Sequence, residues 1–499
     1  MIFKVQDVDI STGGPLIAIM NHKDALEGDF HYEDRIRVTH KKKSTIAILD
    51  ISESDKQVPS GRIGLMEEVL RILEVRHGSI VKVESEKTPQ SVHYIREKLD
   101  GKELGKEKIE EIIKDIVNNS LTPVEMTYFV AGCYHKGLSR QEIVNLTKSI
   151  VHNGDTFKPK SKIVVDKHCV GGVPGNRTTM VVVPLVAAAG LTIPKTSSRS
   201  ITSPAGTADS MEVLAEVSLP IEKLKRIIGK VHACMIWGGA FSLAAADDKL
   251  IRLRHPLSLD PIGMVLASVL AKKKAVNATH VLVDIPLGKG AKIQTRLEAL
   301  KFKHLFEGIG KELGMKVKAI ITDGSQPIGN GIGPALEARD VLWALQNNVR
   351  APQDLIKKSL LAAGEIFEMV GKSEKGEGRK LAAQLLYSGE GYNKMVQIIK
   401  AQGPKVTDPS KIILGKHRLH IRATKSGTIR HIDNKTISRI AWSAGAPVDK
   451  TAGLYLYKHK GNRVKTGEAL YTIYSDSREK LRFAASLANK NSGFVIRFP

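Results

Sequence analysis

The stretch Asp166-Lys-His-Cys-Val-Gly-Gly-Val-Pro-Gly-Asn-Arg-Thr-Thr179 decides the fold of this 499-residue chain. An apolar run, 163–165, leads into it and a second, 180–189, leads out, an order that predicts a buried strand, a glycine-rich turn and a buried helix. The glycines allow backbone N–H groups to converge at the positive end of the helix dipole, and Lys167 adds a point charge. We therefore expect an anion site here, with phosphate as the anion.

A second polar stretch, 195–212, holds six hydroxyl residues between Thr196 and Ser203. It follows the strand-like run 191–193 and precedes a helical pattern, and Arg199 inside it has the planar fork that binds an oxyanion. Taken alone, a Gly-Gly turn can serve tight packing and a serine-rich run can be a solvated loop. The glycine spacing matches neither the P-loop nor the dinucleotide fingerprint.

Together, the segments 166–173 and 198–212 resemble the two signatures of the thymidine/pyrimidine-nucleoside phosphorylase family. Two departures favour one branch. Cys169-Val170 stands where the nucleoside enzymes carry Ser-Thr, and the hydroxyl-rich segment 198–206 replaces their glycine-rich loop. With 174–177, this version resembles the AMP phosphorylase branch, which converts a nucleoside 5′-monophosphate and phosphate to free base and ribose 1,5-bisphosphate. The resemblance runs from about residue 90 to the C-terminus, and the N-terminal segment also resembles that branch.

The resemblance implies roles for particular residues. Asp260 is the expected proton donor, although from the residues alone it reads as the N-cap of a helix over 262–274. Ser268 and Lys272 match a Ser-x3-Lys pair that reads the base, and Lys292 matches a ligand contact. The residues expected to bind AMP are Gly172, Ser198, Arg199, Ser200, Ile201, Thr202, Ser203, Thr207, Ser268 and Lys292. Those expected to bind inorganic phosphate are Lys167, His168 and Lys272.

The pattern of elements predicts a multidomain α/β protein with four parts. Short strands between glycines predict a β-rich N-terminal domain over 1–86, and amphipathic helices predict a small helical lobe over 87–158. Strands at 163–165, 191–193, 281–284 and 317–321, each followed by glycine and a helical pattern, predict a central, mostly parallel α/β lobe over 159–340. Residues 341–499 read as a C-terminal α+β domain that resembles a barrel-sandwich.

Composition narrows the class of protein. Lys and Arg total 76 against 52 Asp and Glu, a formal net charge of +24. This charge suits either small phosphorylated substrates or RNA, but the cations are dispersed and aromatics are only 5%, so no base-stacking platform is visible. The 3 cysteines lack metal-ligand spacing, and no signal peptide or apolar run of ~20 residues is visible. We expect a cytoplasmic homodimer or larger homo-oligomer without cofactor, metal, membrane or nucleic acid.

Phosphorolysis needs a held phosphate, a stabilised sugar cation and a protonated leaving base. The bound phosphate itself carries negative charge to the sugar cation, so no enzyme nucleophile is required. The expected substrates are AMP, CMP and UMP, with inorganic phosphate as co-substrate. Alternatives are a thymidine/pyrimidine-nucleoside phosphorylase and, from a different class, a basic RNA-binding protein. A phosphoribosyltransferase would need an acidic Mg²⁺–diphosphate site, which the sequence does not offer.

Overall fold

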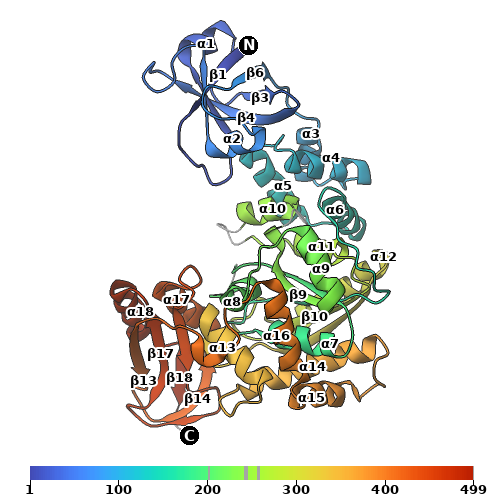
Figure 1. Ribbon diagram of the computed structural model, residues 1–499, viewed down its shortest axis with the longest axis vertical. Helices are drawn as coiled ribbons and strands as arrows, with labels where there is room; N and C mark the ends of the chain where they lie inside the picture. The colour runs from blue at the N-terminus through green and yellow to red at the C-terminus, as the bar shows by residue number, and fades with distance from the viewer. Residues whose placement is uncertain (201–202, 241–244, 255–258, 498–499) are drawn as a thin grey trace. The chain divides into compact units, whose positions relative to one another are not determined.

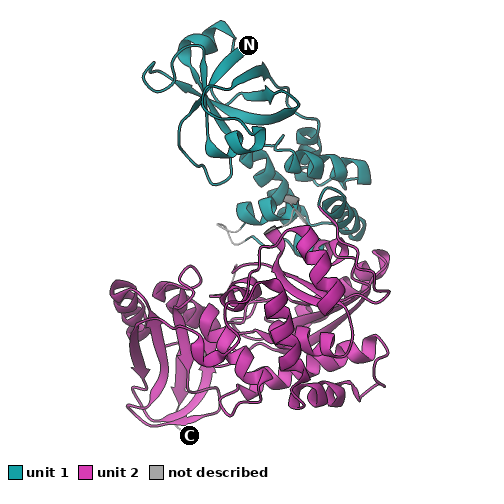
Figure 2. Ribbon diagram, in the orientation of Figure 1, with its two compact units in different colours: residues 1–154, 245–268 teal, residues 155–244, 269–499 magenta. Residues whose placement is uncertain are grey.

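The computed structural model describes residues 1–200, 203–240, 245–254 and 259–497. It divides into two compact units (Figure 2): unit 1 comprises residues 1–154 and 245–268, and unit 2 comprises 155–244 and 269–499. The insertion of 245–268 into unit 1 cuts across the predicted central lobe. Helix α11 (Ile262–Ala275) contributes residues to both units.

Unit 1 begins with a closed six-stranded barrel in the order β1-β5-β2-β4-β3-β6 (Figure 1). Alternate side chains, such as Phe3 and Val5 on one strand and Ile36 and Val38 on another, point into one apolar core. Closure was not predicted, because only three of the six strands show clear alternation in the sequence. The elements are β1 (Ile2–Asp7), β2 (Ile17–Asn21), α1 (His22–Glu27), β3 (Arg35–His40), β4 (Lys43–Ser52), β5 (Arg62–Leu65), α2 (Glu67–Leu73) and β6 (Ile80–Ser85).

The rest of unit 1 is helical: α3 (Ser91–Leu99), α4 (Lys106–Val117), α5 (Pro123–Lys136), α6 (Arg140–His152) and α10 (Ala245–Arg254). The apolar face of α4 is buried, and a capping box of Ser139 and Glu142 starts α6. The Glu142 carboxylate also accepts from the buried Lys98 Nζ at 2.8 and 2.9 Å, which ties α6 to α3.

Unit 2 is built on parallel strands. β11, β10 and β7 form one parallel sheet and β8 pairs with β9 in parallel, and a parallel bridge between Val164 and Thr192 joins the two groups. A mostly parallel sheet, as predicted, brings the carboxyl ends of its strands to one edge, where the loops that bind ligands lie. The strands are β7 (Val165–Cys169), β8 (Ile193–Ser197), β9 (Ala233–Trp237), β10 (His280–Leu287) and β11 (Lys316–Asp323).

Helices surround this sheet, and the apolar faces of most of them share one core with it. Helix α7 is apolar all round and wholly buried, as expected of a helix enclosed by other elements. The helices are α7 (Thr178–Ala188), α8 (Thr207–Leu214), α9 (Ile221–Val231), α12 (Arg296–Glu312), α13 (Pro334–Leu345), α14 (Gln353–Met369), α15 (Gly378–Tyr387) and α16 (Glu390–Gln402). Helices α14–α16 therefore belong to the α/β core, although they lie beyond residue 341.

The C-terminal β module has a four-stranded sheet, β12-β15-β17-β13, and a three-stranded sheet, β16-β14-β18. Strand β12 comes from the end of the α/β segment and pairs with β15, so the module is tied to the core by backbone hydrogen bonds. Its elements are β12 (Gly331–Ile332), β13 (His417–Arg422), β14 (Gly427–Ile432), α17 (Asn434–Ala444), β15 (Gly453–Leu456), β16 (Arg463–Val464), β17 (Ala469–Ser475), α18 (Arg478–Lys490) and β18 (Phe494–Arg497).

Candidate functional site

The glycine-rich loop follows β7, but the strand is longer than the sequence predicts. It runs from Val165 to Cys169, so Asp166 and Lys167 lie inside the sheet rather than in the turn. The turn proper starts at Val170, and Gly171, Gly172 and Gly175 adopt the left-handed backbone at φ of 95°, 86° and 73°. The loop then delivers Thr178 to the first position of α7.

The charges in β7 are tolerated because partners from distant strands and helices neutralise them. Lys273 Nζ lies 2.7 Å from Asp166 Oδ2. Lys167 Nζ lies 3.8 Å from Asp284 Oδ2 and donates to Thr179 Oγ1 at 3.3 Å. The cluster also holds Lys195, 3.7 Å from Asp166 Oδ1, and Lys358, 3.0 Å from Asp284 Oδ2.

This buried cluster has more lysines than aspartates. Four lysines face two aspartates, and each of the six side chains is at most 9% exposed. Desolvation of unbalanced charge is unfavourable, and a bound anion would relieve it. The cluster adjoins the glycine loop. Lys167 belongs to the strand before the loop, and its hydrogen-bond partner Thr179 belongs to the helix after it.

Burial and neighbouring charges shift the pKa values of groups in and beside the cluster. Burial lowers the pKa of Lys167 below its ordinary value, although the Asp284 carboxylate opposes the shift. Burial likewise lowers the pKa of Lys195, and the neighbouring Asp166 offsets part of it. The pKa of His168 falls well below its ordinary value, first through burial and then through the nearby ammonium groups of Lys273 and Lys195. The His168 imidazole is therefore neutral at neutral pH and a poor source of a proton.

Two loops that are far apart in the sequence meet at Gly172. A side-chain carbon on Gly172 would lie only 2.4 Å from the backbone N of Lys292, in the turn after β10. Gly288, in that same turn, would similarly meet Ser325 N at 2.5 Å. The structure thus brings together Gly172 and Lys292, both predicted for the site. Only glycine allows so close an approach at residues 172 and 288.

The hydroxyl-rich loop after β8 is closed by Asp209, for which the sequence alone predicted no role. The buried Asp209 Oδ2 accepts from Ser200 N at 2.7 Å and from Gly206 N at 2.9 Å. Ser200 Oγ donates to Ser203 O, and Ser203 Oγ donates to Ala205 O at 2.8 Å. The predicted residues Ile201 and Thr202 lie outside the described residues.

The arginine predicted to bind phosphate in this loop is engaged with acidic neighbours. Arg199 donates to Glu212 Oε2 at 2.7 Å and to Oε1 at 2.8 Å, and its guanidinium lies 4.8 Å from the centre of the Trp237 ring. The hydrogen bond to Glu212 raises the pKa of Arg199, while the bond from Arg199 lowers the pKa of Glu212 to about 2. Ser198, next to Arg199, is exposed.

Arg177, to which sequence reasoning gave no role, links the two loops. Its Nη1 donates to Thr207 Oγ1 at 3.1 Å and its Nη2 to Ala205 O at 3.0 Å, while Nε pairs with Glu337 at 2.5 Å. Thr207, a predicted ligand, is thereby fixed at the first turn of α8. The only signal available was that Arg177 ends the segment 174–177, which follows the first signature; its partners lie 28 to 160 residues away.

Two predicted residues belong to unit 1. Asp260 is exposed and precedes Pro261, whose carbonyl accepts from Val265 N at 3.0 Å and so begins the hydrogen bonding of α11. Asp260 thus lies two residues before Ile262, the first residue of α11. Ser268 Oγ donates to Asp247 Oδ2 at 2.6 Å, with both residues buried. Lys272, one turn further along α11 in unit 2, is half-buried.

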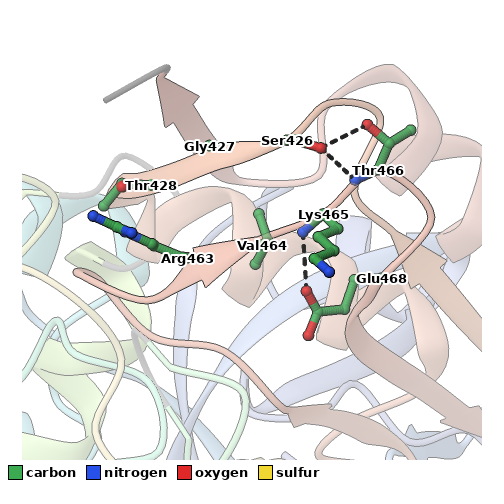
Figure 3. Close-up of a pocket in the computed structure, with 8 residues that line it drawn as sticks. All are labelled: Ser426, Gly427, Thr428, Arg463, Val464, Lys465, Thr466 and Glu468. Atoms are coloured by element: carbon green, nitrogen blue, oxygen red, sulfur yellow. Dashed lines mark hydrogen bonds between the residues drawn. The ribbon is translucent and has the colours of Figure 1, made fainter.

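Two cavities in unit 2 help to delimit the site. One of about 490 Å³ lies at the carboxyl end of β11 and is lined in part by Thr322 and Lys358, which contact Asp284 of the cluster. Another of about 710 Å³ lies in the C-terminal module between Ser426–Thr428 and Arg463–Glu468 (Figure 3), and none of the predicted site residues lines it. Within the described part of the chain, no group of three or more His, Cys, Asp or Glu is placed to hold a metal ion.

Comparison with known families gives three matches along the chain. Residues 92–154 match the glycosyl transferase family helical bundle domain, residues 161–392 its a/b domain, and residues 428–494 the pyrimidine nucleoside phosphorylase C-terminal domain. AMP phosphorylase of Pyrococcus furiosus is 43% identical over 489 residues, covering 98% of this chain and 96% of the relative. The chain belongs to the AMP phosphorylase and pyrimidine-nucleoside phosphorylase family.

Other relatives agree at the level of the family. AMP phosphorylase of Methanocaldococcus jannaschii is 42% identical over 485 residues, covering 97% of this chain and 95% of the relative. A Legionella pneumophila relative that carries the name of a thymidine phosphorylase is 43% identical over 467 residues, covering 94% of this chain and 89% of the relative. The chain is thus a phosphorylase of the glycosyltransferase class that acts on nucleosides or nucleotides.

A solved structure shows that the fold is shared more widely. Anthranilate phosphoribosyltransferase from Thermus thermophilus superposes with a TM-score of 0.53 at 17% identity, over 62% of this chain and 98% of the other. At this identity the likeness concerns the fold alone. Among the helices of the described segments, none combines the length and apolar character needed to cross a bilayer.

Proposed function

We propose that this protein is a nucleoside 5′-monophosphate phosphorylase that converts AMP and phosphate to adenine and ribose 1,5-bisphosphate. The observation that carries this choice is the loop 198–206, which is rich in hydroxyls and held closed by Asp209. A side-chain carbon added to Gly206 would lie 2.6 Å from the Ser198 carbonyl oxygen and 2.6 Å from the Arg199 carbonyl carbon, so Gly206 packs tightly against the start of the loop. The hydroxyls of Ser200 and Ser203, which here donate to the carbonyls of Ser203 and Ala205, would turn to a dianionic 5′-phosphate.

The co-substrate phosphate is assigned to the glycine loop and the cluster beneath it. Lys167, His168, Gly172 and Thr207 form this side, with Lys272 as a further candidate. The excess of buried lysine over aspartate favours an anion there, and the nucleophile is the phosphate itself. A neutral His168 can still donate one hydrogen bond to a phosphate oxygen without carrying charge.

The nucleotide is assigned to the remaining residues. Ser198, Ser200, Ile201, Thr202 and Ser203 would hold the 5′-phosphate, and Arg199 would join them by exchanging a Glu212 oxygen for a phosphate oxygen. Ser268 and Lys292 would contact the base or the phosphate. Asp260 would protonate the leaving base, since the neutral His168 is a poor acid.

We extend the proposed substrate range to CMP and UMP. In the proposed site the 5′-phosphate would make the strongest contacts with the protein, and the base would make fewer contacts. The competing function is a thymidine or pyrimidine-nucleoside phosphorylase, which the Legionella relative favours. Hydrogen bonds to a charged group are each worth ~1.5–3 kcal/mol, so a few of them to the 5′-phosphate separate the two possibilities by a wide margin.

The test is the release of free base from AMP, CMP, UMP, adenosine and thymidine, each with and without phosphate. We expect phosphate-dependent release of adenine, with kcat/KM for AMP exceeding that for adenosine by roughly 10²-fold or more. Equal rates on AMP and adenosine would favour the nucleoside phosphorylase. No base release from any of them, together with salt-dependent retention of RNA, would favour the basic RNA-binding protein.

A further inference from the structure

The contact between Ser268 and Asp247 constrains how Ser268 can bind a base. Ser268 lies on α11 and is 6% exposed; Asp247 lies on α10 and is 3% exposed. The Ser268 hydroxyl donates to Asp247 Oδ2 at 2.6 Å, a distance typical of a charge-assisted O–H···O bond. Both residues belong to unit 1, so this contact lies within one compact body.

A hydroxyl has one hydrogen, and the carboxylate takes it. Ionised carboxylate oxygens only accept hydrogen bonds, so Ser268 must be the donor in this pair. The remaining capacity of Ser268 Oγ is its lone pairs, and towards any other group it is an acceptor only. A serine in the same place without Asp247 could rotate its hydroxyl and either donate or accept.

We propose that Asp247 is a positioning residue that fixes Ser268 as a hydrogen-bond acceptor for an N–H group on the edge of the substrate base. The inference rests on the proposed function, in which Ser268 faces the base. Adenine and cytosine offer an exocyclic amino group, and uracil offers its ring N–H. An unsubstituted purine has a C–H group where adenine has its amino group, so purine riboside 5′-monophosphate would leave the Ser268 acceptor without a donor.

The hydrogen bond from Ser268 also helps to satisfy the buried Asp247 carboxylate. A buried carboxylate needs hydrogen-bond donors whether or not it takes part in substrate binding. A purely structural role would make Asp247 matter for stability and equally for all substrates. A positioning role would make it matter for the choice of substrate. The ratio of kcat/KM between two substrates separates these roles, because intrinsic differences in reactivity cancel when variants are compared.

The experiment compares AMP with purine riboside 5′-monophosphate in the wild type, Asp247→Asn and Ser268→Ala. We expect the wild type to prefer AMP by about tenfold or more, because an unpaired buried acceptor costs at least one hydrogen bond. In Asp247→Asn the amide can either donate or accept, Ser268 can turn, and the preference should fall towards onefold to threefold. Ser268→Ala should lose the preference as well, which keeps the test valid if Asp247→Asn folds poorly.

Asp340→Asn is the matched control, since it makes the same chemical change at another buried aspartate. The described hydrogen bonds of Asp340 come from the backbone N–H groups of Asn330 and Gly331. It should keep the wild-type ratio. Unchanged ratios in Asp247→Asn and Ser268→Ala would overturn the inference, as would a wild type that uses both nucleotides equally. If the wild type releases no base from AMP, the proposed function itself fails.

Discussion

Gly172 and Lys292 touch through their backbones, at the point where the loop after β7 meets the turn after β10. A side-chain carbon on Gly172 would lie 2.4 Å from Lys292 N and 3.1 Å from the Ala291 carbonyl carbon. No side-chain rotation can relieve an overlap with backbone atoms. The spacing between the proposed phosphate loop and the proposed nucleotide turn therefore depends on a single hydrogen atom at residue 172.

Gly172→Ala should thus separate the two loops and reduce activity sharply. The variant combines left-handed backbone strain at φ 86° with the overlap, so we expect kcat/KM for AMP to fall by ~10²-fold or more. Gly190→Ala is the control, since Gly190 has φ 83° and no atom within 4 Å of its added carbon. It should cost only about 1 kcal/mol of strain and leave activity within twofold. Steady-state kinetics on both variants measure this, and equal effects would rule out the contact as the cause.

Lys167 should determine the affinity for inorganic phosphate. Methionine fills a similar volume, and Asp284 keeps Lys358 at 3.0 Å and the Thr322 hydroxyl at 2.5 Å, so Lys167→Met should fold. We expect KM for phosphate to rise at least tenfold, through loss of a charged contact worth ~1.5–3 kcal/mol. Lys358→Met removes another lysine of the cluster from the same carboxylate and should raise KM for phosphate less than Lys167→Met does. An unchanged phosphate affinity in Lys167→Met would remove Lys167 from the site.

The sequence predicted the parallel sheet and the loops that carry the site, because apolar runs and glycines mark them locally. It misjudged where β7 ends, because Asp166 and Lys167 look like loop residues until their partners are known. Those partners, Lys273 and Asp284, are more than 100 residues away. The closed N-terminal barrel was missed for the same reason, since three of its strands have weak alternation and gain stability only by pairing.

The function of Asp209 and Arg177 was equally invisible. Each acts by holding backbone groups of a loop, and a sequence does not record which backbone a side chain reaches. The predicted phosphate ligand Arg199 shows the reverse problem. Its residue type suited an anion, yet in the structure its guanidinium is held by Glu212. The residue type of Arg199 therefore did not reveal which groups its guanidinium contacts.

The stability of unit 2 should decrease as the pH rises through the acid range because of Asp340. Burial raises the pKa of Asp340 from 3.8 to about 7, although the N–H groups of Gly331 and Asn330 oppose the shift. The folded state therefore holds a proton that the unfolded chain releases near pH 4. The stabilisation from that proton is complete below about pH 4 and is lost as the pH rises towards 7.

Asp340→Asn should remove this dependence, because the amide oxygen can still accept from Gly331 N and Asn330 N without ionising. Melting temperatures of the variant and the wild type, measured from pH 4 to 8, should diverge in favour of the variant as the pH rises. The difference should level off above about pH 7, at a size on the order of 1 kcal/mol or more. A difference independent of pH would mean that Asp340 titrates at its ordinary pKa.

Asp260→Asn tests whether the exposed carboxyl before α11 is the proton donor. Pro261 accepts the first hydrogen bond of α11 from Val265 N, so the helix does not depend on Asp260 for that bond and the melting temperature should hardly change. As a general acid, Asp260 should support kcat, and we expect kcat with AMP to fall by ~10²–10⁴. The loss should shrink for a 5′-monophosphate whose leaving group departs without protonation.

The control for this change is Asp408→Asn, at a half-buried aspartate whose side chain accepts from Ser410 N at 2.9 Å to cap a short 3₁₀ turn. It should leave kcat unaltered. If Asp260→Asn instead lowers the melting temperature and keeps most of the activity, Asp260 has only a structural role. His168 would then be a weak replacement, since its neutral imidazole has no spare proton at neutral pH. A phosphate-bound proton would be the remaining source for the leaving base.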